Sequence, residues 1–315
     1  MEKTIKLKSM SEAKTLCGTN DENLNSMERE LGVKIVARGE DFKITGEEKN
    51  VGRAAKLIDE ILLTIRNGGI IKKHELLYAI KAIKDDPGLD LHNIYLDRIE
   101  VSSKRLYITP RSKGQKEYVD AIRHYDIVFC VGPAGTGKTY LAMAMAVNAL
   151  RKGIVSRIIL TRPAVEAGES LGFLPGDLHA KVTPYLRPLY DALYDMMEAD
   201  EIEKNVERGI IEVAPLAYMR GRTLNDSFII MDEAQNSTPE QMKMFLTRLG
   251  FDSKTVITGD ITQSDLPTHK SSGLMHVQSI LKNIEGIKFI YLKGEDVVRH
   301  ELVQEIIKAY DAYQE

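Results

Sequence analysis

The chain has 315 residues, of which 43% are hydrophobic and 28% are charged, and its net charge is −3. This composition is typical of a folded globular protein, and the near balance of charge excludes a polycation that coats nucleic acid through bulk charge. Two cysteines, Cys17 and Cys130, are too few for a disulfide framework, and no apolar run reaches the roughly 20 residues of a membrane helix. We therefore expect a soluble, cytoplasmic protein of about two domains without a membrane segment.

The first 66 residues predict a small α/β domain with the element order β-α-α-β-β-α. Residues 67–99 follow as a linker that contains one helix at 73–84. In the N-terminal domain, alternating apolar residues indicate strands, and apolar residues at helical spacing indicate helices. The expected strands are 4–7, 33–37 and 41–45, and the expected helices are 12–16, 21–31 and 51–65.

From residue 100 to 315 the pattern changes to short apolar strands that alternate with helices. Strands that are apolar along their whole length indicate a mostly parallel sheet covered by helices on both faces. We therefore expect one α/β core in this region. Its predicted strands are 127–131, 155–161, 211–214, 227–232, 255–258 and 287–292, and its predicted helices lie near 139–151, 185–198, 238–249, 274–283 and 299–313.

The sharpest motif directly follows the predicted strand at 127–131 and opens the next helix. Glycines let backbone N–H groups wrap closely around a phosphate chain, and a helix start presents its positive end to phosphates. Lys138 would reach the β- and γ-phosphates of a nucleotide, and the Thr139 hydroxyl would hold Mg²⁺. The motif satisfies G-x-x-x-x-G-K-[ST] with Gly132, Pro133, Ala134, Gly135, Thr136, Gly137, Lys138 and Thr139.

Two carboxylates, Asp232 and Glu233, end the predicted strand at 227–232. They would lie at the sheet edge where open α/β sheets bind their ligands. Asp232 would hold Mg²⁺, and Glu233 would orient and deprotonate the attacking water. A small-molecule kinase needs no water-activating glutamate beside its metal ligand, so the pair favours hydrolysis of a nucleotide over phosphate transfer.

Several further residues complete the predicted site. Gln263 would hydrogen-bond the γ-phosphate from the end of the next strand, with a capped turn as the alternative, and Gln115 would read the adenine base. Hydrolysis also needs a cation that stabilises the spreading charge. Because only one nucleotide core fits in the chain, a neighbouring subunit would supply that arginine, which predicts a ring-shaped homo-oligomer. The candidates, each with a surface salt bridge as its alternative, are Arg220, Arg222 and Arg299.

Together these residues resemble the PhoH-like ATPases over roughly residues 105–313. The resemblance implies a RecA-type core like that of superfamily 1 helicases, ATP as the cofactor, a cytoplasmic location and a link to RNA metabolism. Glu301 stands where the family is expected to carry a proline, so the resemblance does not predict the conformation of the turn there. Beyond the phosphate loop, the resemblance rests on residues 161–164, 168–176, 184–193, 219–223, 232–236 and 296–300.

RNA would have three candidate binding segments. The N-terminal element order resembles a KH-type fold, in which a G-x-x-G loop clamps the nucleic-acid backbone. This chain has Gly18-Thr19-Asn20-Asp21 there, and the charge of Asp21 would repel phosphate, so oligomerisation or partner docking is the alternative role. The second candidate is a basic strip at 98–123, where Tyr107 and Tyr118 would stack on bases. The alternative is that this strip is only a solvated basic face. The insert at 162–187 is favoured, because it would leave the same sheet edge as the phosphate loop.

We therefore expect an ATP- and Mg²⁺-dependent ATPase that works as an oligomeric motor on single-stranded RNA or on a protein–RNA assembly. Such a motor could also unwind RNA as a helicase. The alternative is a nucleotide-switched scaffold that docks an RNA-processing protein partner without unwinding RNA. Stimulation of ATP hydrolysis by single-stranded RNA would separate the two hypotheses.

Overall fold

The computed structural model describes residues 1–66, 73–85, 97–102, 107–163, 178–266 and 271–298, together with residues 302, 303, 306, 309 and 310. The chain divides into two compact units, Met1–Arg98 and Ile99–Glu315. None of the helices in the described ranges combines the length and the apolar composition that crossing a membrane requires.

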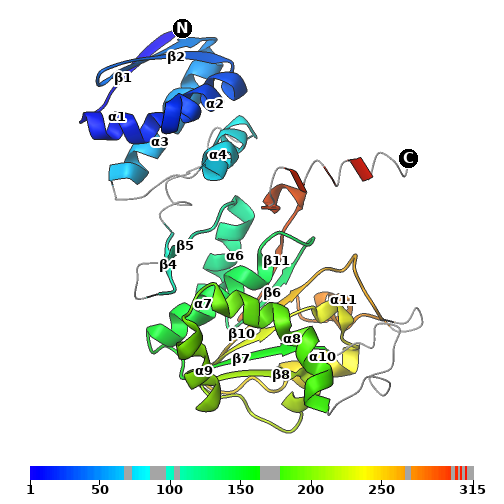
Figure 1. Ribbon diagram of the computed structural model, residues 1–315. Coiled ribbons are helices and arrows are strands. Elements are labelled where there is room, and N and C mark those ends of the chain that lie inside the picture. Colours follow the sequence, from blue (N-terminus) through cyan, green and yellow to red (C-terminus); the bar gives the residue numbers. More distant parts are fainter. Residues whose placement is uncertain are drawn as a thin grey trace. The chain divides into compact units, whose positions relative to one another are not determined.

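The N-terminal unit contains an antiparallel sheet of three strands, in the order β1-β3-β2, with helices packed on one face (Figure 1). Buried residues alternate along the strands, so that Ile5, Ile35 and Phe42 face the helices. The predicted order of elements is confirmed, and the KH likeness stays a prediction. The elements are β1 (Glu2–Lys6), α1 (Met10–Cys17), η1 (Thr19–Asp21), α2 (Glu22–Leu31), β2 (Val33–Arg38), β3 (Asp41–Gly46) and α3 (Glu48–Arg66).

The turn between α1 and α2 has an unusual backbone. Gly18 ends α1 with φ of 74°, and Asn20 and Asp21 follow with φ of 52° and 57°. Among non-glycine residues, Asn and Asp enter this left-handed region most readily. Asp21 therefore adopts a glycine-like conformation at the position where a G-x-x-G loop has its second glycine.

The helix predicted inside the linker belongs to the N-terminal unit. This helix, α4 (Lys73–Asp85), packs against α2 and α3. Leu76, Ile80 and Ile83 lie on its buried face and join the same hydrophobic core as α3. Because these apolar residues recur at helical spacing, the helix needs an apolar partner, and the core extends past the boundary predicted at residue 66.

In the described ranges, the second unit is built around six parallel strands in the order β11-β6-β10-β9-β7-β8 (Figure 1). Every neighbouring pair in this sheet is parallel, which confirms the predicted α/β core. Each strand matches a predicted one to within two residues at either end. The strands are β6 (Ile127–Val131), β7 (Arg157–Arg162), β8 (Ile211–Pro215), β9 (Ser227–Met231), β10 (Lys254–Gly259) and β11 (Ile287–Tyr291).

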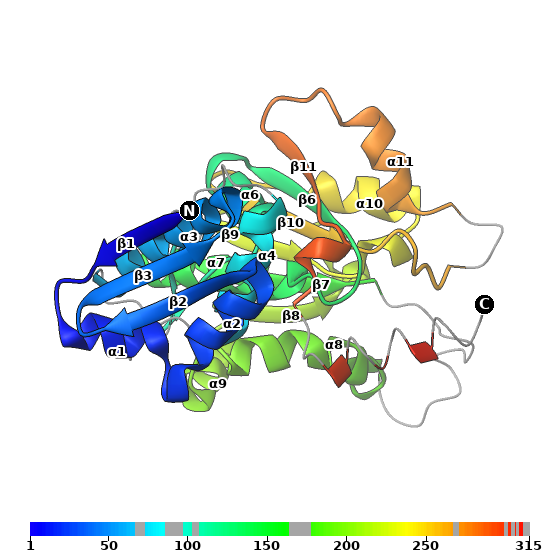
Figure 2. The same cartoon turned by 90° about the horizontal axis from the view of Figure 1, so that it is seen from above.

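Helices cover both faces of this sheet, with α8 and α9 on one side and α10 and α11 on the other (Figure 2). Val128 and Cys130 of β6 point into the core shared with α7, whereas Phe129 and Val131 point into the opposite core. A strand buried on both faces is apolar at every position, which explains the continuous apolar runs. The helices are α6 (Lys113–His124), α7 (Lys138–Arg151), α8 (Leu178–Tyr194), α9 (Ala199–Glu207), α10 (Pro239–Leu246) and α11 (Gly273–Ile280).

Two of these helices, α6 and α9, are absent from the predicted elements. A short hairpin of β4 (Ile99–Glu100) and β5 (Tyr107–Ile108) also precedes α6. Tyr118 on α6 is fully buried, so its predicted role in stacking on a nucleic-acid base is wrong. Both helices carry few apolar residues among many charges, which hides their buried faces from the sequence.

Candidate functional site

The phosphate-loop motif joins the carboxyl end of β6 to the start of α7, in the predicted strand–loop–helix context. Gly135 and Gly137 adopt left-handed conformations with φ of 83° and 79°. A residue with a Cβ atom would be strained in this conformation. No described side chain caps the first turn of α7, which begins at Lys138. The N–H groups of that turn therefore point outward for an anion, and the loop fits a phosphate chain.

Lys138 lies folded into the loop. Its Nζ donates to the carbonyl oxygens of Gly132 at 2.6 Å and Pro133 at 2.9 Å. Burial lowers the pKa of this ammonium, while the nearby carboxylates of Asp260 and Asp232 act in the opposite direction. Because an ammonium has three donors and a flexible stem, it can exchange these carbonyl oxygens for phosphate oxygens.

Gln115 braces the loop from the α6 side. Its Nε2 donates to the carbonyl oxygen of Thr136 at 3.0 Å, and its Oε1 accepts from the backbone N–H of Arg111 at 2.6 Å. The side chain is buried, with 3% of the residue exposed. Both ends of its amide are thus engaged within the protein, and the predicted contact with adenine stays a prediction.

A second brace comes from the segment after β11. The backbone N–H of Val298 donates to the carbonyl oxygen of Gly135 at 3.0 Å. This segment is anchored by the buried carboxylate of Asp296, which accepts from Ser112 Oγ at 2.5 Å and from the backbone N–H of Lys293 at 2.8 Å. Residues distant in sequence therefore fix the loop on both sides.

Asp232 and Thr139 meet at the sheet edge. The Thr139 hydroxyl donates to Asp232 Oδ1 at 2.6 Å, and the Thr258 hydroxyl donates to the same oxygen at 2.7 Å. Nearby, Asp260 Oδ2 is buried and accepts no hydrogen bond from the described residues. Mg²⁺ prefers oxygen ligands and is usually held by one or two carboxylates together with substrate phosphates. These side chains therefore fit a magnesium site beside the phosphate loop.

Glu233 leaves β9 in a left-handed conformation with φ of 53°, which is rare for glutamate. Two donors hold its carboxylate: Arg162 Nη2 lies 3.0 Å from Oε1, and Gln235 Nε2 donates to Oε2 at 2.5 Å. Arg162 and Gln235 lie in predicted motifs, but the sequence assigns neither of them a contact with Glu233. The available signal for Arg162 was its position at the carboxyl end of a predicted strand.

Gln235 also connects this carboxylate to the loop after β10. Its Oε1 accepts from the backbone N–H of Asp260 at 3.0 Å, and its Nε2 donates to the carbonyl oxygen of Gln263 at 3.1 Å. The backbone of Gln263 thus contacts Gln235, which itself holds Glu233, and the Gln263 side chain is exposed. Its predicted contact with the γ-phosphate stays a prediction.

The candidate arginines are placed differently. Arg222 forms a bidentate ion pair with Glu212, in which Nη1 donates to Oε1 at 2.6 Å and Nη2 donates to Oε2 at 2.7 Å. These hydrogen bonds raise the pKa of Arg222. Arg220 is exposed and follows η3 (Leu216–Met219) beyond the carboxyl end of β8. Arg299 and residues 164–177 of the predicted RNA-binding insert lie outside the described residues. The arginine that acts between subunits therefore stays a prediction.

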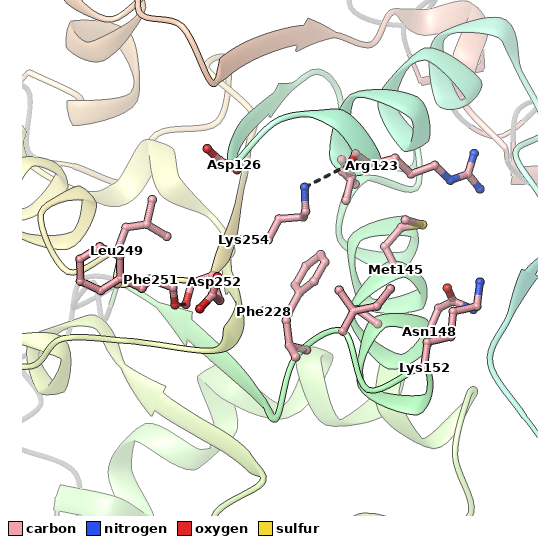
Figure 3. A pocket seen from close by; sticks show the side chains of 16 residues that line it. Arg123, Asp126, Met145, Asn148, Lys152, Phe228, Leu249, Phe251, Asp252 and Lys254 are labelled. Atoms are coloured by element: carbon pink, nitrogen blue, oxygen red, sulfur yellow. Dashed lines mark hydrogen bonds between the residues drawn. The ribbon is translucent and has the colours of Figure 1, made fainter.

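A cavity of about 750 Å³ lies at the opposite end of the sheet, by the amino ends of β6, β7, β9 and β10 (Figure 3). Lys254 reaches across it and donates to the carbonyl oxygens of Tyr125 at 2.7 Å and Arg123 at 3.4 Å. The described lining includes no phosphate-loop residue. Because the chemistry-bearing side chains gather at the carboxyl edge, we place the functional site there.

The comparisons with known proteins identify the family of this chain. The family described as "PhoH-like protein" matches residues 107–311. A PhoH-like protein of Bacillus subtilis is 54% identical over 97% of this chain and 96% of its own length, and one of Synechocystis is 49% identical over 98% and 94%. Protein PhoH of Escherichia coli is 44% identical over 64% of this chain and 58% of its own length.

Among solved structures, the Pif1 helicase from Candida albicans aligns with a TM-score of 0.34 and 16% identity, over 62% of this chain and 42% of the helicase. That likeness is too loose to inform fold or function. The sequence matches extend through both compact units, and the family match at residues 107–311 covers the segment that holds the phosphate loop. The chain therefore belongs to the PhoH-like protein family.

Proposed function

We propose that this protein binds ATP with Mg²⁺ and hydrolyses it to ADP and phosphate. The observation that carries the proposal is the contact between the Thr139 hydroxyl and the Asp232 carboxylate at 2.6 Å. This contact joins the phosphate loop to the end of β9. Lys138 directly precedes Thr139 in the chain, and Glu233 directly follows Asp232. Positioned cations and a water-activating residue at one site are what phosphoryl transfer to water requires.

The residues of this chain have distinct parts in the proposed reaction. Lys138 and the N–H groups of the loop balance the charge of the phosphate oxygens, and Mg²⁺, held by Thr139 and Asp232, would add positive charge there. Glu233 accepts a proton from a water molecule as the water oxygen bonds to the terminal phosphorus. The bond from that phosphorus to its bridging oxygen breaks, and ADP leaves with the electron pair.

Glu233→Gln tests the assignment of the base, because an amide keeps the size of the side chain but cannot accept the proton. We expect near-normal ATP binding, measured with a fluorescent analogue, and a kcat about 10²- to 10⁴-fold lower. Lys138→Ala removes the charge from the loop and measures the background from contaminating ATPases. Normal turnover in Glu233→Gln would contradict the assignment.

We further propose, as the purpose of hydrolysis, a homo-oligomeric motor on single-stranded RNA in the cytoplasm. The support is the resemblance to PhoH-like ATPases and the start of the β7–α8 connection at Arg162, beside Glu233. Hydrolysis should then rise with added single-stranded RNA and stay at background in Lys138→Ala. Turnover that RNA does not change would contradict the motor.

A mixing experiment tests the arginine proposed to act between subunits. Arg299→Ala and Glu233→Gln should each be inactive alone. Mixed oligomers should regain activity if Arg299 of a Glu233→Gln subunit serves the intact glutamate of its neighbour. In a parallel mixture, Arg220→Ala takes the place of Arg299→Ala. The arginine variant whose mixture with Glu233→Gln regains activity identifies the arginine that acts between subunits.

One contact favours the second candidate, a nucleotide-switched scaffold for an RNA-processing protein partner. The bond from Val298 to Gly135 links the phosphate loop directly to the segment that leads into the C-terminal residues. A change in the loop would therefore reach that segment without any RNA. The scaffold predicts nucleotide-dependent assembly, visible in light scattering, together with turnover that is indifferent to RNA.

A further inference from the structure

We propose that Arg162 is a positioning residue, whose guanidinium fixes the carboxylate of Glu233 in the orientation that hydrolysis needs. The inference rests on the proposed ATPase function. It assigns a part in the reaction to a residue on a different strand from Glu233.

The sheet itself brings Arg162 to Glu233. Strands β7 and β9 are parallel neighbours with Thr161 opposite Met231. The backbone N–H of Asp232 donates to the carbonyl oxygen of Thr161 at 2.9 Å, so the two strand ends are tied together. Arg162 therefore leaves β7 at the level where Glu233 leaves β9, and its Nη2 reaches Oε1 at 3.0 Å.

The backbone of Glu233 indicates that its orientation is imposed from outside. A non-glycine residue in the left-handed region persists only where surrounding contacts hold it, and such residues cluster at functional sites. The contacts here are partly shielded from water, because 21% of the Arg162 side chain and 35% of the Glu233 side chain are exposed. An ion pair in this setting is screened less than one on the open surface.

The two carboxylate oxygens are held from opposite sides. Arg162 holds Oε1 from β7, and Gln235 holds Oε2 while its own amide oxygen accepts from the N–H of Asp260 after β10. Each carboxylate oxygen retains a lone pair for a water molecule. The carboxylate is thus oriented by two donors and still able to take a proton, which is the arrangement of a base held by a third group.

Arg162→Ala and Arg162→Gln test the proposal, and Arg157→Ala, at the amino end of the same strand, is the matched control. We expect both Arg162 variants to keep the KM for ATP and the affinity for a fluorescent analogue, with kcat at least 10-fold lower. Added methylguanidinium should restore part of the kcat of Arg162→Ala, while sodium chloride at equal ionic strength should not. The control should resemble the wild type.

A double-mutant comparison tests whether Arg162 acts through Glu233. In a Glu233→Gln background, Arg162→Ala should lower kcat no further, because the group that it positions is already disabled. An equal loss in both backgrounds, a raised KM, or a raised kcat in Arg162→Ala would overturn the inference. An inactive wild type would refute the proposed ATPase and the inference with it, whereas an active wild type with normal Arg162→Ala turnover would refute the inference alone.

Discussion

Replacing Gly132 with alanine should destabilise the C-terminal unit specifically. Gly132 follows β6 at the point where the end of β11 passes closest to it. An added Cβ would lie 2.6 Å from the carbonyl oxygen of Leu292 and 2.9 Å from its Cβ. The residue cannot turn away easily, because its N–H donates to the carbonyl oxygen of Gly259 at 3.1 Å.

The size of the effect follows from this overlap. Ordinary van der Waals contact begins at 3.4 Å, so Leu292 would have to retreat by about 0.8 Å. Its own N–H is bonded to the carbonyl oxygen of Val131 at 2.8 Å, which ties it to β6. Overpacking of this kind costs about 1–3 kcal/mol. For a unit of this size, that corresponds to a melting temperature roughly 2–12 °C lower.

Differential scanning calorimetry can assign the loss, because the two units should unfold as separate transitions. Gly132→Ala should shift the transition of the C-terminal unit and leave that of the N-terminal unit unchanged. Gly294→Ala is the control, since its added Cβ meets nothing within 4 Å. An unchanged C-terminal transition in Gly132→Ala would refute the reasoning, as would an equal shift in Gly294→Ala.

Two further predictions concern single contacts. Hydrogen bonds from Arg66 and from the N–H of Lys8 lower the pKa of Glu12 from 4.5 to about 2. The contribution of this carboxylate to the free energy of unfolding is therefore present above pH 4.5 and lost as the pH falls toward 2. In urea titrations at a series of pH values, the unfolding free energy of Glu12→Gln should fall less steeply between pH 4.5 and 2 than that of the wild type. Tyr118→Phe removes the bond from the phenol to the carbonyl oxygen of Lys138 at 3.1 Å. We expect the C-terminal unit to lose about 1 kcal/mol, and an unchanged urea midpoint would show that the bond contributes nothing.

The strands and the phosphate loop were predictable because each is encoded locally. A short apolar run such as 127–131, rich in β-branched residues and followed by glycines, favours a strand buried on both faces, and the glycine pattern after it has one common use. The pairing of Asp232 with Thr139 also followed, because both residues end up at the carboxyl edge of one parallel sheet. Local pattern and sheet geometry were sufficient for these residues.

Arg162 and Gln115 were harder to interpret because their partners come from other parts of the chain. The contact of Arg162 with Glu233 requires β7 and β9 to be neighbours, and sequence order does not determine which strands pair. Gln115 gives no sign in the sequence that its amide bridges the backbone of Arg111, just before α6, and that of Thr136 in the phosphate loop. The stacking role predicted for Tyr118 is wrong because the charges around it hide the buried face of α6.

The bond from Val298 to Gly135 limits how far the C-terminus can be trimmed. A protein ending before Asp296 would retain all eight residues of the motif. It would lose that bond and also the partner of Ser112, whose hydroxyl caps the helix that carries Gln115. Tolerance to deletion depends on the contacts of the backbone removed rather than on its distance along the chain. Serial deletion should therefore reduce nucleotide affinity when Val298 is removed and reduce it again when Asp296 is removed.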